Sequence, residues 1–339
     1  MTNKLTLEEV GKLAGVSRST VSRVINDQPG VKKPVREQVL QVIEETGYIP
    51  NPAARSLAAN RTMILGFVVP RSIATFFGDP YFSKLTQGIS QACYANNYML
   101  SLFLFYTRED EQMLLPHISQ NSFVDGLIVQ ATTDSDPIIP HLLHSSINFI
   151  VLGSLNEMDP SLNFIDVDND SGGFLATEHL INLGYKRIAH ISGTLESHSA
   201  QDRKVGYEKA LVKHGYPIDP GLIIEGDFTE EGGYNCTKKL LKKKPDAIFA
   251  SSDSMAVGVL RAAKEVGLSV PNDLAIVGYD DLPPAISTSP QLTTVHQPIR
   301  QFGVNAVEML IDIITNGNKL PHQAIYDTHL VIRESCGAQ

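Results

Sequence analysis

Polar side chains near the start of the chain are spaced to read nucleic acid. Arg18, Ser19, Ser22 and Arg23 fall on one face of a helix expected over residues 18–25, whose other face is apolar. An arginine can donate two hydrogen bonds to O6 and N7 of guanine, and serine hydroxyls can contact phosphates or base edges. The pattern therefore predicts DNA contacts made by the outer face of this helix.

The elements that must position this face are visible in the neighbouring sequence. Residues 6–26 read TLEEVGKLAGVSRSTVSRVIN. Thr6 and Glu9 have the spacing of a capping box for a first helix, and Ser17 is a good N-cap for the second. A third helix is expected over residues 34–46. Together these elements predict a helix-turn-helix unit that can place its second helix in the major groove.

The charge distribution supports this interpretation. Residues 1–62 hold nine Lys and Arg against six Asp and Glu, a net charge of +3, whereas the whole chain carries −9. The remaining residues therefore carry −12. A basic head on an acidic body is expected when only the head meets a polyanion.

The segment after the bundle predicts a short hinge helix. Residues 48–58 read YIPNPAARSLA, in which Asn51 can cap a helix and Pro52 suits its first turn. Such a short helix is marginal in water and would gain order against a partner helix and DNA. Leu57 lies on it with nothing nearby to bury it, and a side chain so placed can wedge between base steps from the minor groove.

The pattern of apolar and polar residues changes from residue 63 onward. Apolar runs of five to eight residues alternate with helix-length segments, which is typical of buried parallel sheets. Residues 63–339 are too many for a single α/β core, so two lobes with a cleft between them are expected. The runs are MILGFVVP (63–70), YMLSLFLF (98–105), VDGLIVQA (124–131), NFIVLG (148–153), FIDVD (164–168), RIAHISG (187–193), AIFASSD (247–253) and LAIVGYDD (274–281).

Polar and aromatic residues near the ends of these runs are candidates for a ligand site, because ligands collect at the carboxyl ends of parallel strands. They are Arg203, Phe228, Asp253, Asp280, Asp281 and Gln297. Carboxylates and an arginine can make paired hydrogen bonds to vicinal hydroxyls, and an aromatic face can stack on a sugar ring. Asp253 could instead cap the helix that follows it.

The chain resembles the LacI (lactose repressor) family of bacterial transcription regulators over essentially its whole length. The resemblance rests on TLEEVGKLAGVSRSTVSRVIN, on GYIPNPAARSLA and on their short spacing. It implies an all-α helix-turn-helix domain (1–49), a hinge helix and linker (50–62) and a two-lobed, periplasmic-binding-protein-like α/β core (63–339). It also implies that the chain crosses between the lobes near residues 163, 291 and 327. The N-lobe is then 63–163 with 292–327, and the C-lobe is 164–291 with 328–339.

The resemblance also assigns roles to particular positions. Arg18, Ser19 and Arg23 match base-reading and phosphate-contacting positions, and Leu57 matches the minor-groove leucine. The predicted DNA-binding set is Thr6, Ser17, Arg18, Ser19, Thr20, Ser22, Arg23, Asn26, Asn51, Ala54, Arg55 and Leu57. The predicted effector-binding set is Tyr81, Phe82, Arg203, Phe228, Ser252, Asp253, Asp280 and Gln297. Ser252 stands where the lactose-type site has Asn, and Asp253 matches a residue that more often supports the structure.

Other chemistries find little support. Asp166, Asp168 and Asp170 alternate as in a calcium loop, but Ser171 replaces the required Gly and the closing Glu is out of register. His141 and His144 lack a third metal ligand nearby. No nucleotide-binding or hydrolase motif occurs, so neither an enzyme nor a cofactor is expected. Three scattered cysteines, no signal peptide and no membrane-length apolar run favour the cytoplasm.

These observations predict a ligand-responsive transcription regulator that acts as a repressor. It is expected to bind a near-palindromic operator as a homodimer. The effector is expected to be a small sugar or sugar derivative. A purine-like effector that tightens DNA binding remains an alternative, because Arg203 and Phe228 could serve either ligand. A solute-binding transport protein would account for the core but not for residues 1–62. The chain lacks the leucine-heptad segment that makes some relatives tetrameric, which favours a dimer.

Overall fold

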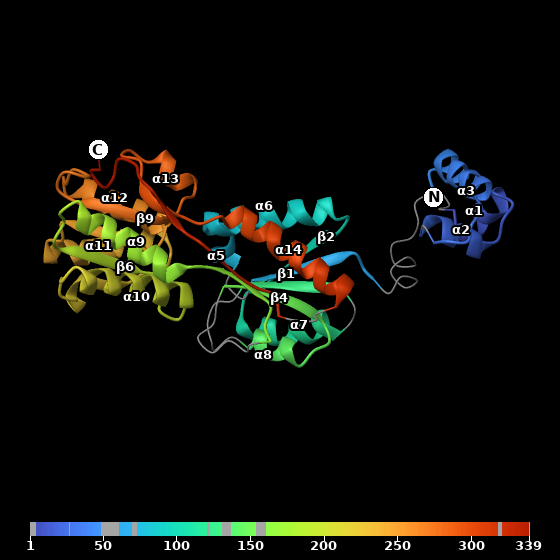
Figure 1. Ribbon diagram of the computed structural model, residues 1–339, viewed down its shortest axis with the longest axis horizontal. Coiled ribbons are helices and arrows are strands. Elements are labelled where there is room, and N and C mark those ends of the chain that lie inside the picture. Colours follow the sequence, from blue (N-terminus) through green and yellow to red (C-terminus); the bar gives the residue numbers. More distant parts are fainter. Residues whose placement is uncertain are drawn as a thin grey trace. The chain divides into compact units, whose positions relative to one another are not determined.

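The computed structural model describes residues 5–26, 28–48, 61–69, 73–120, 123–130, 137–153, 161–317 and 321–338. The chain forms two compact units, one built on the residues up to Met63 and a larger one built on the residues from Ile64 (Figure 1). Each unit has its own hydrophobic core and is described separately below. Within the described residues, no helix is both long and apolar enough to cross a membrane.

The described part of the first unit contains three helices, α1 (Leu7–Leu13), α2 (Arg18–Ile25) and α3 (Lys33–Thr46). Their shared core is built on Val10, Ala14, Val21, Val24 and Val39. The predicted capping box is confirmed, because Thr6 and Glu9 each accept a hydrogen bond from the other's backbone N–H. Gly15 turns the chain between α1 and α2 at φ +61°, a conformation that favours glycine. The predicted helix-turn-helix is therefore present.

The third helix starts one residue earlier than expected. It begins at Lys33 and follows Lys32, whose side chain makes no capping hydrogen bond. Its end is as predicted, since Gly47 terminates it in the left-handed conformation at φ +61°.

The larger unit contains two six-stranded sheets, one in each lobe. The first sheet has the order β11-β5-β4-β3-β1-β2 and is parallel throughout. Its strands are β1 (Ile64–Val69), β2 (Met99–Leu104), β3 (Gly126–Gln130), β4 (Asn148–Leu152), β5 (Phe164–Val167) and β11 (Gln323–Tyr326). Helices α6 (Pro80–Ala95) and α14 (Ile299–Asn316) pack together on one side of it, and α7 (Arg108–Gln120) and α8 (Ile138–Leu143) lie on the other (Figure 1). A short helix, α5 (Ile73–Gly78), precedes α6.

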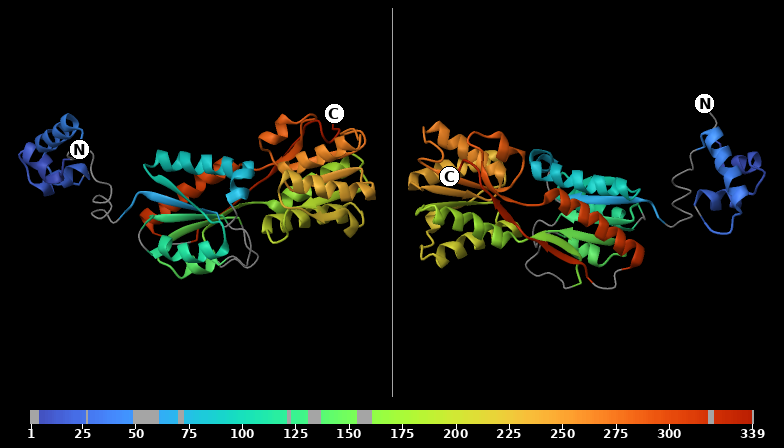
Figure 2. Two further views of the ribbon diagram at one scale, coloured as in Figure 1. Left: turned by 180° about the vertical axis from the view of Figure 1, so that it is seen from behind. Right: turned by 45° about the horizontal axis from the view of Figure 1, so that its top comes forward.

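The second sheet has the order β12-β10-β9-β8-β6-β7, with β12 antiparallel to β10 and the other pairs parallel. Its strands are β6 (Ile188–Ser192), β7 (Ile223–Glu225), β8 (Ala247–Ala250), β9 (Ala275–Asp280), β10 (Thr293–His296) and β12 (His329–Val331). Its helices are α9 (Asn169–Asn182), α10 (His198–Lys213), α11 (Glu230–Leu240), α12 (Asp253–Glu265) and α13 (Pro283–Ser287), with the 3-10 turns η1 (Pro220–Leu222) and η2 (Leu241–Lys243). Figure 2 shows this lobe from two further directions.

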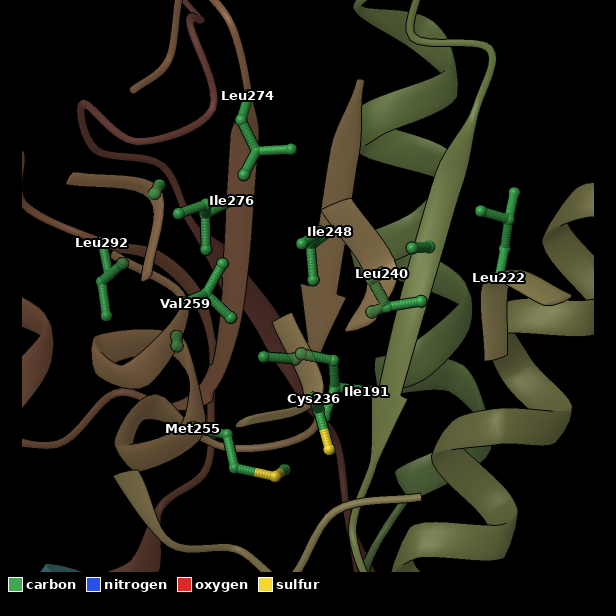
Figure 3. Close-up of a cluster of buried hydrophobic side chains, with 14 of the residues drawn as sticks. Ile191, Leu222, Cys236, Leu240, Ile248, Met255, Val259, Leu274, Ile276 and Leu292 are labelled. Carbon is green, nitrogen blue, oxygen red and sulfur yellow. The ribbon is translucent and has the colours of Figure 1, made fainter. Parts of the chain in front are cut away.

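Alternating strand residues build a separate core on each face of the second sheet. Ile248 and Ile276 belong to the cluster that packs against α11 and α12, which Figure 3 shows. Their sequence neighbours Phe249 and Val277 belong to the cluster on the opposite face, against α9 and α10. Because both faces are covered, these strands are apolar throughout, as expected for buried parallel strands.

Two of the three expected crossing points are displaced. We expected the chain to leave the N-lobe near residue 163 and to return near 291. However, β5 still pairs in the first sheet and β10 still pairs in the second. The crossings therefore follow Val167 and His296, and the third lies between β11 and β12, near residue 327 as expected. Which sheet recruits a strand is decided by pairing with distant strands, and neither displaced position carries a local signal.

Four of the described strands were not among the predicted runs. Strands β7 and β12 are only three residues long, and β11 lies at a sheet edge with alternating exposure. Strand β10 is buried but short and carries two threonines, so its sequence does not form an apolar run.

Candidate functional site

The second helix of the small unit presents the predicted DNA-reading face. Arg18, Ser19 and Arg23 are exposed, whereas Val21 and Val24 are buried against the other two helices. The buried valines fix the orientation of α2, so the basic and hydroxyl side chains must point outward. This is the arrangement that a recognition helix requires.

Other predicted DNA-contacting residues also have local structural roles. Thr6 caps α1, and the hydroxyl of Ser17 caps α2 while bonding to the hydroxyls of Ser19 and Thr20, at 2.8 and 2.9 Å. Asn26 ends α2 and its amide donates to the hydroxyl of Ser22. Asn51, Ala54, Arg55 and Leu57 lie outside the described residues.

The larger unit contains a cavity of about 400 Å³ that is lined by residues of both lobes. Seven of the eight predicted effector-binding residues line it: Tyr81, Phe82, Arg203, Phe228, Ser252, Asp280 and Gln297. The other lining residues are Asp79, Gln130, Gly153, Asp166, Asn169, Thr194, Ser197, His198, Ser199, Asp227, Thr229 and Phe302. Residues far apart in sequence thus meet at the carboxyl ends of the strands, as expected for sheets of this kind.

Arg203 is held in place by the second lobe before any ligand arrives. The side chain is 5 % exposed. Its Nε donates to Asn169 Oδ1 at 2.9 Å, and its Nη1 donates to the carbonyl oxygen of Ser251 at 2.6 Å. The guanidinium carbon lies 3.7 Å from the centre of the Tyr279 ring, a cation–π contact. Such anchoring lowers the entropy cost of ordering the side chain around a ligand.

Asp280 ends strand β9 and lies beside this arginine, with 3.8 Å between its Oδ1 and Nη1 of Arg203. Its Oδ1 also accepts a hydrogen bond of 2.6 Å from the amide of Gln297. Burial raises the pKa of Asp280 well above its ordinary value, and the charge of Arg203 opposes this rise. Since Gln297 lies on a crossing segment, the pair connects the cavity to the region where the lobes join.

Aromatic side chains form part of the cavity wall from both lobes. Phe228 adopts a left-handed backbone conformation at φ +64°, and its ring packs so closely on Gly193 that a Cβ there would lie 1.9 Å from it. Tyr81 and Phe82 come from the first turn of α6, with their rings 5.4 Å apart and edge to face. The phenol of Tyr81 donates to Gln130 Oε1 at 3.4 Å.

Asp253 corrects one sequence prediction, because it does not line the cavity. The carboxylate is fully buried, and its oxygens accept hydrogen bonds from the Thr294 hydroxyl at 2.6 Å and the Leu282 N–H at 2.8 Å. It thereby fixes the loop that follows Asp280. Ser252 is the N-cap of α12, accepting from the Met255 N–H, so Asp253 is not the cap either.

Several lining residues were not predicted from the sequence. Asp79 is the N-cap of α6, two residues before Tyr81, and its position at a helix start in the N-lobe was a usable signal. Asn169 follows a strand end, as do the residues that were predicted. By contrast, Ser197, His198 and Ser199 carry no local signal that separates them from an ordinary loop.

The alternating aspartates that mimic a calcium loop have separate partners. Asp166 accepts from the Val167 N–H and the Asn169 amide, Asp168 caps α9, and Asp170 pairs with Lys209. Across the part of the chain that the structure describes, no group of three His, Cys, Asp or Glu side chains is arranged to hold a metal ion.

Comparison with known proteins connects both units to regulators. Residues 6–51 match the family described as bacterial regulatory proteins, lacI family, and residues 177–336 match the periplasmic binding protein-like domain. The chain is 35 % identical over 333 residues to the HTH-type transcriptional regulator CelR of Thermobifida fusca, covering 97 % of this chain and 98 % of that one. It is 38 % identical over 320 residues to the HTH-type transcriptional repressor PurR of Haemophilus influenzae (strain PittEE), covering 92 % and 91 %.

Solved structures show the same likeness over the full length. A transcriptional regulator CelR–cellobiose complex matches with a TM-score of 0.77 and 33 % identity, covering 98 % of this chain and 99 % of that one. The lac repressor dimer bound to operator and the anti-inducer ONPF matches with a TM-score of 0.86 and 29 % identity, covering 99 % and 100 %.

Proposed function

Because this chain belongs to the LacI family of bacterial regulatory proteins, and is a transcription regulator rather than an enzyme, we propose that it represses transcription under the control of a small carbohydrate effector. In this proposal two chains bind a near-palindromic operator, one helix-turn-helix head on each half-site. The effector binds in the cavity between the lobes of the core.

The preorganised centre of the cavity carries the effector proposal. Arg203 offers donors that are already oriented by Asn169 and Ser251, and Asp280 lies 3.8 Å from it as an acceptor. An adjacent donor and acceptor fit vicinal hydroxyls, which both donate and accept. Phe228 supplies an aromatic face for the apolar side of a sugar ring. A volume of about 400 Å³ falls in the usual range for small-molecule sites.

The relatives agree with a carbohydrate of this size. The CelR structure is a complex with cellobiose, and this chain is 33 % identical to it along 98 % of its own length. A neutral disaccharide or monosaccharide is therefore the first class of compound to test.

The exposed face of α2 supports operator binding. Its arginines can fork onto guanine edges or neutralise phosphates, whereas residues 63–339 carry a net charge of −12, which disfavours contact with DNA. The lac repressor match is a dimer bound to operator, which supports the same assembly here.

Apolar side chains exposed on the first lobe support dimerisation through it. Tyr94 near the end of α6 and Met99 at the start of edge strand β2 are 87 % and 69 % exposed. Leu102 on the same strand and Met113 on α7 are also exposed. Large apolar side chains that remain exposed together in one subunit commonly mark a protein interface.

The crossing segments offer a route from effector to DNA. Gln297 contacts Asp280 in the cavity and lies on a crossing, so closure around a ligand would change how the lobes meet. We propose that this change alters the spacing of the two heads. Whatever the effector does to operator affinity, the operator must do to effector affinity by the same factor.

A purine-like effector is the second candidate, and the similarity to repressors named PurR supports it. A planar base could stack on Phe228 and bond to Arg203. In that case the effector would be expected to tighten operator binding.

A thermal-shift screen of the full chain against sugars and purines tests the proposal. A compound at a hundred times its Kd stabilises the folded state by about 2.7 kcal/mol, which is readily measured. Compounds that stabilise the chain are then added to an operator-binding assay, with DNA selected from a random pool by the protein itself. A sugar that changes operator affinity supports the proposal, and a purine that does so favours the second candidate. If neither class stabilises the chain, control by a small effector is refuted.

A further inference from the structure

The lining of the cavity is unbalanced in charge. Four carboxylates line it, from Asp79, Asp166, Asp227 and Asp280. Among the described lining residues, the guanidinium of Arg203 is the one permanent positive charge. A ligand that enters this space therefore meets more negative than positive groups.

Three of these carboxylates interact electrostatically with the phenol of Tyr81. Burial raises the pKa of the Tyr81 phenol, and the charges of Asp166, Asp280 and Asp79 raise it further. Only Arg203 acts in the opposite direction. Because Tyr81 and these three carboxylates all line the cavity, the carboxylates lie beside the space that a ligand would occupy, where burial also limits screening by salt.

The guanidinium of Arg203 already contacts several groups of the second lobe. Its Nη1 is 3.8 Å from Asp280 and 2.6 Å from the carbonyl oxygen of Ser251, and its ring partner is Tyr279. It therefore serves to offset the buried carboxylate beside it. No second lysine or arginine lines the described cavity to offset the acidic groups on the facing lobe.

The acidic groups of the first lobe are built into its framework. Asp79 caps α6 and accepts from the Tyr81 N–H at 2.9 Å; burial raises the pKa of this carboxyl, and the hydrogen bond and the charge of Arg203 oppose the rise. Asp166 is 7 % exposed, and its Oδ1 accepts from the Val167 N–H at 2.7 Å and the Asn169 amide at 3.3 Å. Neither side chain can turn away from a ligand without breaking these bonds.

Building on the proposed carbohydrate effector, we infer that the effector is uncharged, and that Asp79 and Asp166 exclude phosphorylated and carboxylated forms of the same sugar. A phosphate group adds a charge of about −1.5 to −2 near neutral pH. A unit charge about 12 Å away, acting through an effective dielectric constant of about 20, changes affinity roughly tenfold. Two framework carboxylates should therefore disfavour the phosphorylated form by about a hundredfold or more.

Titration calorimetry of the full chain with matched compounds tests this inference. The probes are glucose with glucose 6-phosphate and glucuronate, ribose with ribose 5-phosphate, and cellobiose with cellobionate. We expect binding by one or more neutral members, and at least hundredfold weaker binding by the anionic member of the same set. Equal or tighter binding by an anionic member overturns the inference while leaving a carbohydrate effector in place. Failure of every compound overturns the carbohydrate proposal itself, and the inference with it.

Isosteric variants locate the origin of the selectivity. Asn retains the capping and accepting oxygen of Asp, so Asp79→Asn and Asp166→Asn should keep the fold. We expect each to lower the discrimination against the anionic member about tenfold, measured as the ratio of the anionic to the neutral dissociation constant within the same variant. Asp312→Asn removes the same charge from an exposed position on α14 outside the cavity and should leave discrimination unchanged. Unchanged discrimination in both cavity variants would overturn the assignment.

Discussion

Replacing Arg203 with alanine removes the cation from the centre of the cavity and leaves its partners unsatisfied. Asn169 and Ser251 each lose a donor, and Asp280 loses its counter-charge in a site where it is only 5 % exposed. Removing one member of a buried ion pair typically costs about 3–5 kcal/mol. The cost should fall at the low end, about 3 kcal/mol, because Asp280 can take up a proton instead of remaining charged.

The same substitution should abolish the response to effector. Two hydrogen bonds from a charged donor, at about 1.5 kcal/mol each, correspond to a loss of affinity of roughly a hundredfold. The melting temperature of the core should fall by roughly 6–12 °C, from about 2–4 °C per kcal/mol for a domain of this size class. Operator binding without effector should persist, because the helix-turn-helix is a separate compact unit with its own core.

Arg261→Ala is the matched control. Arg261 also contacts two carboxylates, of Glu230 and Glu231, and lies over the ring of Tyr234, but it is exposed on α12. Exposed ion pairs contribute little, so we expect a small change in stability and normal effector binding. Thermal unfolding, calorimetric titration and operator-binding assays with and without effector compare the two variants. An Arg203→Ala protein that still responds normally to effector would refute the assignment of the cavity.

Further predictions concern DNA binding, the helical unit and pH. Arg23→Ala should weaken operator binding at least tenfold and lower its salt dependence without changing effector affinity; unchanged operator affinity would remove α2 from the interface. Leu57→Ala should weaken specific operator binding in a mobility-shift assay, and its failure to do so would contradict the minor-groove wedge. Thr6→Ala removes the capping box and should destabilise the helical unit by about 1 kcal/mol, measured by amide exchange in α1; unchanged exchange would contradict the value placed on the cap. Effector hydroxyls that donate to Asp280 should lower its raised pKa, so binding should release protons and tighten as pH rises; calorimetry in two buffers checks the sign, and net proton uptake would contradict it.

Local sequence patterns predicted much of the fold. The capping box at Thr6, the cap at Ser17 and the stop at Gly47 depend on neighbours within a few residues, and all three are present. Apolar runs located eight of the twelve described strands, because a strand covered on both faces is usually apolar throughout. Strands such as β7 and β11, which are short or lie at an edge, do not have to meet this condition.

The candidate site was predicted less completely than the fold. The resemblance and the strand-end rule together placed Arg203, Phe228, Asp280 and Gln297 in one cavity. They also included Asp253, whose carboxylate is turned into the protein rather than toward the cavity. Two adjacent positions at a strand end can point in opposite directions, and local sequence does not say which one a distant helix will cover.

The sequence by itself determined the kind of protein this is, because helix caps, apolar periodicity and the head-to-core charge contrast are properties of neighbouring residues. Only the tertiary structure decided where the chain crosses between lobes and which side chains share the cavity. Asp79 and Asp166 show the difference, since they come from a helix start and a strand end 87 positions apart in sequence and gain their common electrostatic role only when the first lobe folds. Strand pairing and lobe packing depend on contacts between distant segments, and those contacts set the charge that a ligand meets.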